Sequence, residues 1–153
     1  MIDSNVWWAV GFIEADGCFT IIHSTHGGRF SQYYPRFKVG QRADNSIALY
    51  RIQEILGGIG AICGPYSANP LKPNDKPTQM LTIAKKEELV QLVALLDKYP
   101  LKTKKASDYA IWRKAVLLWS STDNSRHSKE PIWLQMREYW EQLKEAHKYR
   151  NKV

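Results

Sequence analysis

The fold of this chain is decided near its N-terminus by the stretch Ala9-Val10-Gly11-Phe12-Ile13-Glu14-Ala15-Asp16-Gly17. The apolar run over residues 6–13 predicts a helix. The start of this helix can be capped by Asp3, Ser4 or Asn5. Gly17 is expected to end the helix in a left-handed conformation, which glycine adopts more readily than other residues. The last turn then holds Glu14 and Asp16, where the helix dipole disfavours negative charge by roughly 0.3–1 kcal/mol.

Two interpretations of these acids are open. If both carboxylates point into water, screening makes their cost small. The helix is apolar nearly all round, however, which is typical of a buried helix, and its acids would then lie at the mouth of the core. A bound cation would offset their charge there. Gly11 and Ala15, four residues apart on one face, are small enough to let another helix approach closely.

The composition bounds the class of protein. A length of 153 residues with 44% apolar and 12% aromatic content fits one globular domain with its own core. A net charge of +7 and a pI near 9.4 favour a nucleic-acid partner. We find neither an apolar run of membrane-spanning length nor a secretory leader, so an intracellular, unsecreted protein with no membrane partner is expected. Cys18 and Cys63 are most simply small apolar side chains.

Periodicity along the rest of the chain predicts two hairpins, each followed by helix. Alternating side chains indicate strands, and apolar residues at helical spacing indicate helices. The predicted strands cover residues 18–24, 33–41, 59–66 and 78–84, and the later helices cover residues 49–56, 86–98, 109–119 and 132–150. This order predicts an α+β fold in which both hairpins form one antiparallel sheet, backed by helices on one face.

The uncovered sheet face carries side chains that suit DNA. On the first hairpin the expected contacts are Thr20, Ile22, Ser24, Arg29, Tyr34, Arg36 and Lys38. On the second hairpin they are Cys63, Tyr66 and Gln79. Arginine can bind guanine edges bidentately, other polar groups read other base edges, and a β-ribbon fits the major groove. An ordinary solvated sheet face is the alternative for any single residue, but the cations gathered on one hairpin favour DNA.

The stretch from Gly11 to Gly17 resembles the LAGLIDADG motif of homing endonucleases. Ala9 and Val10 stand where the motif has Leu and Ala, and Glu14 replaces its first Asp. The resemblance implies a single domain over residues 1–153 with the αββαββα fold, a saddle-shaped four-stranded sheet and extra C-terminal helices. It also implies that Asp16, which matches the final acid, is the metal-binding catalytic residue.

Metal is expected on physical grounds as well. Hydrolysis of a phosphodiester needs charge stabilisation and an activated water, which Mg²⁺ bound by carboxylate oxygen supplies. Asp16 would provide that oxygen, and the carbonyl of Ala15 is a second ligand. Mn²⁺ could replace Mg²⁺, Ca²⁺ could occupy a non-cleaving complex, and no other small-molecule cofactor is expected. By the resemblance, Gln41 and Lys104, with Lys102 as the alternative lysine, surround the catalytic water.

A single motif in the chain predicts a homodimer, because cutting both DNA strands needs two sites. The motif helices would pack through Trp8, Gly11, Phe12 and Ala15, which brings two copies of Asp16 together over a near-palindromic DNA site. The expected function is a site-specific double-strand break that promotes intron or intein mobility. Such an enzyme is expected in an organelle or a prokaryotic cytoplasm. An RNA maturase or a non-cleaving DNA-binding protein of the same fold is the alternative.

Overall fold

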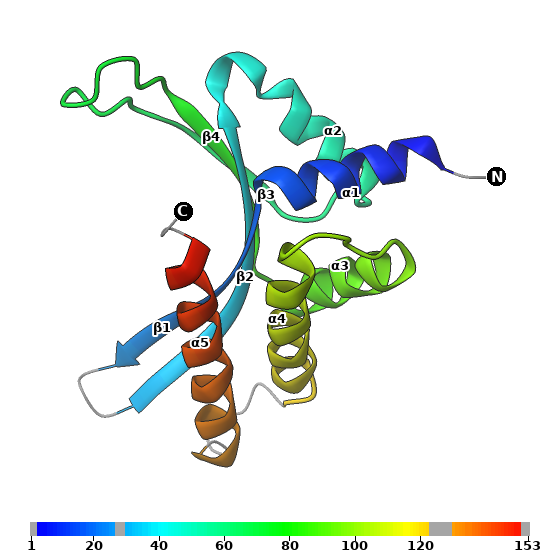
Figure 1. The fold of residues 1–153 in the computed structure, drawn as a ribbon, viewed down its shortest axis with the longest axis vertical. Coiled ribbons are helices and arrows are strands. Elements are labelled where there is room, and N and C mark those ends of the chain that lie inside the picture. Colours follow the sequence, from blue (N-terminus) through cyan, green and yellow to red (C-terminus); the bar gives the residue numbers. More distant parts are fainter. Residues whose placement is uncertain (1–2, 27–29, 123–129, 151–153) are drawn as a thin grey trace.

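The computed structural model describes residues 3–26, 30–122 and 130–150 of the protein (Figure 1). The elements in chain order are α1 (Ser4–Asp16), β1 (Gly17–His26), β2 (Phe30–Arg42), the 3₁₀ turn η1 (Ala43–Asn45), α2 (Ile47–Ile55), β3 (Ala61–Tyr66), β4 (Thr78–Ile83), α3 (Lys86–Lys98), α4 (Lys105–Ser120) and α5 (Glu130–Arg150). This order confirms the predicted α+β fold.

The four strands form one antiparallel sheet in the order β1-β2-β4-β3. Successive side chains on a strand point to opposite faces, and the register aligns the apolar positions of neighbouring strands. Phe19 therefore lies opposite Phe37, and Val39 lies opposite Leu81, with all four side chains buried. The alternation that predicted the strands thus places one face of the sheet in the core.

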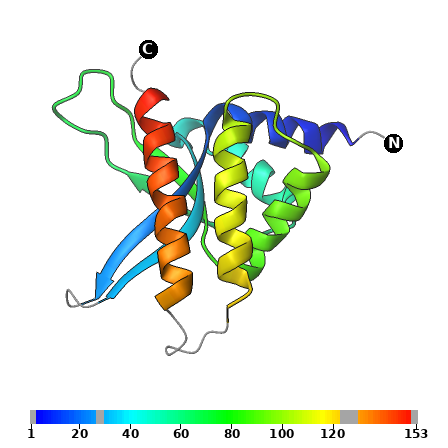
Figure 2. The same ribbon diagram turned by 60° about the horizontal axis from the view of Figure 1, so that its bottom comes forward.

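Helices cover that apolar face. Figures 1 and 2 show α4 and α5 side by side across the β1–β2 hairpin, while α1 and α2 lie at the other end of the sheet. Trp112 of α4 is fully buried, with its ring 4.9 Å from that of Phe19 between centroids. Its Nε1 donates a hydrogen bond of 3.1 Å to the carbonyl of Arg36, so this large side chain buries no unsatisfied donor.

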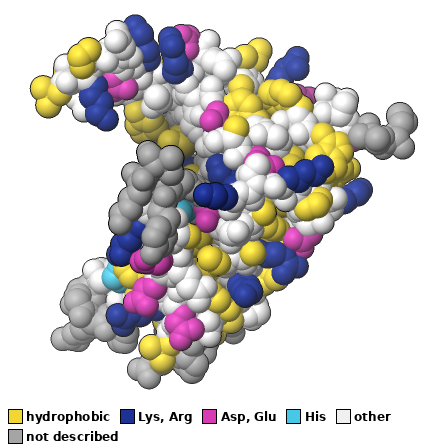
Figure 3. Space-filling view, in the orientation of Figure 1, with side chains coloured by type: hydrophobic (Ala, Val, Ile, Leu, Met, Phe, Trp, Pro, Cys, Tyr) yellow, Lys and Arg dark blue, Asp and Glu magenta, His cyan; other side chains and the backbone are white. Residues whose placement is uncertain are grey.

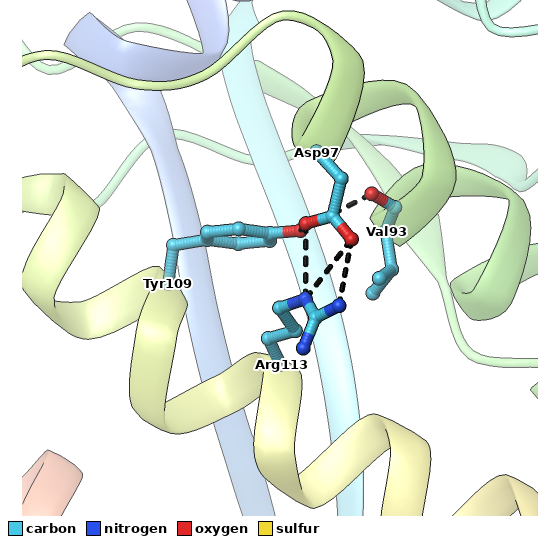
Figure 4. A network of polar contacts seen from close by, with 4 residues as sticks. All are labelled: Val93, Asp97, Tyr109 and Arg113. Atoms are coloured by element: carbon cyan, nitrogen blue, oxygen red, sulfur yellow. Dashed lines mark hydrogen bonds and ion pairs between the residues drawn. The ribbon is translucent and has the colours of Figure 1, made fainter.

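Polar contacts lock α3 against α4 (Figure 4). The Arg113 guanidinium binds both carboxylate oxygens of Asp97, with its closest contact at 2.8 Å. The hydroxyl of Tyr109 donates to Asp97 Oδ1 at 2.8 Å and also lies 3.2 Å from the carbonyl of Val93. Burial and the neighbouring Asp97 carboxylate raise the pKa of Tyr109, so the tyrosine remains a donor. This network fixes the two helices whose connection passes the end of α1.

Helix α1 differs from the expectation in two ways. Asp3 caps its start, since its Oδ1 accepts hydrogen bonds from the backbone N–H of Asn5 and Val6. The expected left-handed Gly17 is wrong, because its φ of −70° and ψ of 152° are extended. Glycine is needed there for space, since an added Cβ would lie 2.5 Å from the Ile13 carbonyl oxygen.

The expectation that α1 is buried all round is also wrong. Its buried side chains are Ala9, Val10 and Ile13, which lie on the face turned to the sheet. Its opposite face is open to solvent, and Trp8 is 43% exposed.

Candidate functional site

The carboxylate of Asp16 lies at the end of α1, exposed to solvent and bound by a neighbouring amide. Nε2 of Gln41 donates to Oδ2 of Asp16 at 2.8 Å, and Nδ2 of Asn45 donates to Oε1 of Gln41 at 3.1 Å. An open hollow of about 410 Å³ adjoins them and is lined by Asp16, Gly40, Gln41, Arg42, Thr78 and Met80. The structure therefore brings together Asp16 and Gln41, two residues predicted for the catalytic site.

The connectivity of the fold explains this meeting. Helix α1 runs into β1 without a loop, because Asp16 ends the helix and Gly17 begins the strand. β2 returns antiparallel to β1, and Gly17 pairs with Val39. Gln41, two residues beyond Val39, then lies on the same side of the strand beside the helix end. The η1 turn that follows β2 supplies Asn45, which sequence analysis did not single out.

Glu14 has a different environment from Asp16. Its Oε1 accepts hydrogen bonds from the backbone N–H of Lys102 at 2.7 Å and of Thr103 at 2.5 Å. Partial burial opposes ionisation of Glu14, but these bonds and the charge of Lys105 outweigh it and hold the pKa below its ordinary value. The expectation that both acids call for a bound cation is therefore wrong for Glu14, whose charge the chain itself accommodates.

The basic segment after α3 lies against α1. Nζ of Lys105 donates to the carbonyl oxygen of Gly17 at 2.5 Å, and Nζ of Lys102 lies 5.3 Å from the centre of the Trp7 ring. The side chain of Lys104 is exposed. The lysine whose side chain donates a hydrogen bond at the end of α1 is thus Lys105. Sequence analysis missed it, although it belongs to the basic run Lys102-Thr103-Lys104-Lys105.

The donors at the end of α1 suit a hard cation. An aspartate oxygen and a backbone carbonyl, here those of Asp16 and Ala15, are ligand types that Mg²⁺ and Ca²⁺ take in proteins. The residues that the structure describes contain no group of three or more His, Cys, Asp or Glu side chains placed to hold a metal ion. One chain therefore offers a partial oxygen site, with a single exposed carboxylate beside the hollow.

The open face of the first hairpin has the expected alternation. Thr20, Ile22, Ser24, Arg36 and Lys38 are partly exposed and lie opposite the buried face. Thr20 pairs with Arg36 in the register, and its hydroxyl donates to the Arg36 carbonyl at 3.3 Å. Arg29 lies outside the described residues. These positions, four polar and one apolar, form a strip beside the hollow, which we call the β1–β2 strip.

Tyr34 differs from the other predicted contacts on this hairpin. Its ring packs edge-on against Trp119 at 5.7 Å and Trp133 at 5.9 Å between centroids, and its hydroxyl donates to Gln32. Burial raises its pKa. β4 pairs with β2 only over residues 37–42, so the edge of β2 at Tyr34 is open to the helix ends. The aromatic ring is therefore engaged within the chain.

The second hairpin divides the predicted contacts between the two faces. Cys63 and Tyr66 are exposed and pair with Met80 and Thr78, respectively. Gln79 pairs with Gln41 and shares the side of its strand with buried Leu81. By the period of two along the run Thr78-Gln79-Met80-Leu81, Thr78 and Met80 lie on the opposite side of the strand from Gln79.

The helix face predicted for self-association is only partly covered by the residues that the structure describes, with Phe12 packed against the core. Trp8, Gly11 and Ala15 are exposed, and Phe12 is half-buried with its ring 5.7 Å from that of Trp8. A Cβ added at Gly11 would meet no atom of the described residues within 4 Å. Figure 3 shows hydrophobic side chains gathered over the surface of α1 and α2. In the part of a single copy that the structure describes, no close contact thus accounts for a glycine in mid-helix at position 11.

The fold and the site define a class of protein. A helix that ends in an exposed aspartate and enters an antiparallel sheet with one open face is the arrangement expected of a LAGLIDADG endonuclease domain. The family model described as LAGLIDADG endonuclease matches residues 9–116. The chain belongs to the LAGLIDADG endonuclease family.

Curated relatives agree with this assignment. The chain is 32% identical over 111 residues to a protein described as a probable intron-encoded endonuclease, Cox1-I1b, of Schizosaccharomyces pombe. It is 29% identical over 116 residues to a probable intron-encoded endonuclease 3 of Neurospora crassa. These matches cover 72% and 74% of the chain, but only 27% and 20% of the two relatives.

Solved structures share the fold. The homing endonuclease I-TnaI superposes with a TM-score of 0.69 at 23% identity, over 94% of this chain and 96% of its own. The archaeal homing endonuclease I-Vdi141I, solved with DNA, gives 0.74 at 23% identity, over 95% and 86%. The I-SmaMI homing endonuclease, solved with cleaved DNA, gives 0.69 at 25% identity, over 91% of this chain and 42% of its own. Among the described helices of the present chain, none has the length and apolar character to cross a membrane.

Proposed function

We propose that the protein is a homing endonuclease that binds a long pseudo-palindromic double-stranded DNA site as a homodimer. It hydrolyses one phosphodiester in each strand with Mg²⁺, and the double-strand break promotes mobility of an intron or intein. The observation that carries the proposal is the exposed Asp16 carboxylate, held by Gln41 beside an open sheet face that bears Arg36 and Lys38. Such an enzyme acts where its target DNA lies, in an organelle or a prokaryotic cytoplasm.

The end of α1 is the proposed metal site. Asp16 holds the ion through carboxylate oxygen, and the Ala15 carbonyl is the second ligand. When bound, Mg²⁺ supplies charge stabilisation at the scissile phosphate and lowers the pKa of a water. Gln41 orients the Asp16 carboxylate without adding charge, since its amide donates a neutral hydrogen bond. Lys104, or Lys102 in its place, contributes positive charge to the phosphate that is cut.

The β1–β2 strip is the proposed DNA surface. Arg36 and Lys38 contribute cations that pair with phosphates or guanine edges, while Thr20 and Ser24 contribute hydroxyls. Ile22 fits a thymine methyl group. Cys63 and Tyr66 extend this surface onto the second hairpin, where both side chains are exposed. The alternation of the strands supports this proposal, because it turns these side chains away from the helices.

The open face of α1 is the proposed dimer interface. One chain has a single exposed carboxylate at the motif, whereas a double-strand break requires two cleavage sites. A second copy packed on Trp8, Gly11, Phe12 and Ala15 would place its own Asp16 beside the first. The open space around Gly11 supports this arrangement, since a close helix crossing needs a residue without a side chain there.

Cleavage is tested on a plasmid that carries the joined flanks of the protein's own intron or intein. We expect Mg²⁺-dependent linearisation by the unaltered protein, no linearisation by Asp16→Asn, and equal DNA binding by both in Ca²⁺. Glu54→Gln, an exposed acid on α2, is the matched control and should cut normally. Binding without cutting by the unaltered protein would indicate the non-cleaving alternative, and splicing of the intron RNA without DNA cleavage would indicate a maturase.

Self-association is tested separately by small-angle scattering with and without the same duplex. We expect two copies on one duplex, and a shift towards one copy for Gly11→Leu, whose side chain would fill the space needed by the second helix. Ala110→Leu adds a side chain at an exposed position on α4 and should leave association unchanged. A single copy of the unaltered protein on saturated duplex would refute the dimer.

A further inference from the structure

The segment from Lys102 to Lys105 contacts α1 and the residue that follows it at three positions, Trp7, Glu14 and Gly17. The Lys102 ammonium lies over the Trp7 ring, the backbone of Lys102 and Thr103 donates to Glu14, and Lys105 donates to the Gly17 carbonyl. Glu14 and its two donors are 88 and 89 residues apart in sequence, so these bonds join the start of the fold to the α3–α4 connection. Lys104 lies between the fastened residues, and its side chain is exposed.

We propose that Glu14 is a positioning residue for DNA cleavage, because its carboxylate fixes the backbone of this segment and thereby sets where Lys104 stands relative to Asp16. The inference rests on the proposed function. Glu14 and Asp16 lie two residues apart in the same helical turn, so a group held by Glu14 is held relative to the acid of the site. Glu14 then acts through the lysine and touches neither DNA nor metal.

The contacts of Glu14 favour positioning over metal binding. Both backbone N–H groups bind the same oxygen, Oε1, at 2.7 and 2.5 Å, and such charge-assisted bonds are about twice as strong as neutral ones. Lys105, from the same segment, sits at the carbonyl end of α1, where positive charge offsets the helix dipole. The Glu14 carboxylate thus has two N–H donors, and the Lys105 ammonium has a carbonyl acceptor. Neither charged group requires a ligand from outside the chain.

The first experiment measures single-turnover cleavage of the duplex in Mg²⁺ and binding of the same duplex in Ca²⁺. A displacement of about 1 Å at a catalytic group can cost about 100-fold in rate. We therefore expect Glu14→Ala to cut about 100-fold more slowly, with unchanged DNA affinity and an unchanged Mg²⁺ midpoint. Glu14→Gln keeps an oxygen that accepts both N–H groups and should retain most of the rate, and Glu54→Gln is the matched surface control.

A double-mutant cycle shows whether Glu14 acts through a lysine. If it does, Glu14→Ala combined with Lys104→Ala should cut no more slowly than Lys104→Ala alone. The same cycle with Lys102→Ala covers the alternative lysine. Losses that multiply in both cycles would overturn the inference. So would a raised Mg²⁺ midpoint for Glu14→Gln, which would make Glu14 a metal ligand.

Hydrogen exchange gives a reading that does not depend on cleavage. The amides of Lys102 and Thr103 should exchange slowly in the unaltered protein and at least tenfold faster in Glu14→Ala, with the core strands unchanged. Equal exchange in both proteins would overturn the contact itself. If the amides respond as expected but the unaltered protein cuts no DNA, the contact stands and the proposed function fails, and the positioning role of Glu14 in cleavage fails with it.

Discussion

The side-chain amide of Gln41 donates to the carboxylate of Asp16 at 2.8 Å across 25 residues of sequence. Asn45 fixes the orientation of the Gln41 amide, because its Nδ2 donates to Oε1 of Gln41 at 3.1 Å. The amide nitrogen of Gln41 therefore faces the acid. A neutral amide can orient a carboxylate without neutralising it. The consequence is that the rotation of the Asp16 carboxylate is restricted, which favours a preorganised site.

Removal of this amide should slow cleavage without weakening DNA binding. For Gln41→Ala we expect a cleavage rate about 10–100-fold lower in Mg²⁺, the range typical when a residue that orients a metal ligand is lost. Single-turnover kinetics on the plasmid substrate measure the rate, and a filter assay in Ca²⁺ measures binding. Gln91→Ala, an exposed glutamine on α3, is the matched control. An unchanged rate for Gln41→Ala would show that Asp16 needs no such orientation.

Gly17→Ala should destabilise the fold through a steric clash. The added Cβ would lie 2.5 Å from the Ile13 carbonyl oxygen and 2.9 Å from the Phe37 ring, both in the core. Overpacking of this kind costs about 1–3 kcal/mol in free energy of unfolding. Urea unfolding at one fixed protein concentration measures it.

The control for that prediction is Ser107→Ala, at an exposed position on α4 and outside the proposed interface. Alanine has a higher helix propensity than serine, by less than about 0.7 kcal/mol, and the change adds no atom to the core. We expect a chain that is no less stable, whereas Gly17→Ala unfolds at lower urea. Equal midpoints for the two variants would contradict the steric account of Gly17.

Much of this architecture could be predicted from the sequence, because local periodicity carries it. The alternation around Phe19 and Phe37 predicted both strands of the first hairpin, and helical spacing predicted α3 with the same bounds that the structure has. Gly17 was placed at the helix end for the wrong reason. Glycine marks both left-handed turns and close packing, and the sequence does not distinguish the two.

The contacts that complete the site could not be predicted in the same way. The bonds from Lys102 and Thr103 to Glu14 depend on how α3 and α4 pack, and no local pattern records a separation of 88 residues. Lys105 was missed because Lys102, Lys104 and Lys105 belong to one basic run, and only the packing of the α3–α4 connection decides which side chain binds at the end of α1. Tyr34 was assigned to the open face because side chains alternate along the strand. In the structure, the unpaired edge of β2 lets its ring reach Trp119.

Lys38→Ala should weaken binding to DNA of any sequence. Lys38 lies on the β1–β2 strip, opposite Cys18 in the register. If it contacts a phosphate, its loss should lower the slope of log affinity against log salt concentration by about 1. Fluorescence anisotropy at several salt concentrations measures this slope. Lys114→Ala removes an exposed lysine from α4, in the helix layer, and should leave the slope unchanged. The same change in both variants would place DNA elsewhere.

Asp97 should link the stability of the α3–α4 pair to acid pH. Hydrogen bonds from Arg113 hold the pKa of Asp97 below its ordinary value of 3.8, against the opposing effect of partial burial, and Tyr109 adds to the lowering. Folding therefore favours the ionised carboxylate, so this contribution is complete above that ordinary value and is lost as the pH falls through the lowered pKa. Because the Asp97 side chain is 38% exposed, solvent screening limits the contribution to about 0.5–1 kcal/mol.

The prediction is measured by urea unfolding between pH 7 and pH 3. Asp97→Asn should lower the free energy of unfolding at neutral pH by about 0.5–1 kcal/mol and should lose less on acidification than the unaltered chain, because it has no proton to bind. Asp44→Asn is the matched control, since Asp44 also pairs with an arginine, but at 64% exposure its pair is more fully hydrated. That control should follow the unaltered chain closely. If Asp97→Asn and the unaltered chain lose stability in parallel down to pH 3, the carboxylate of Asp97 does not couple folding to protonation, and the α3–α4 pair is held by its apolar contacts alone.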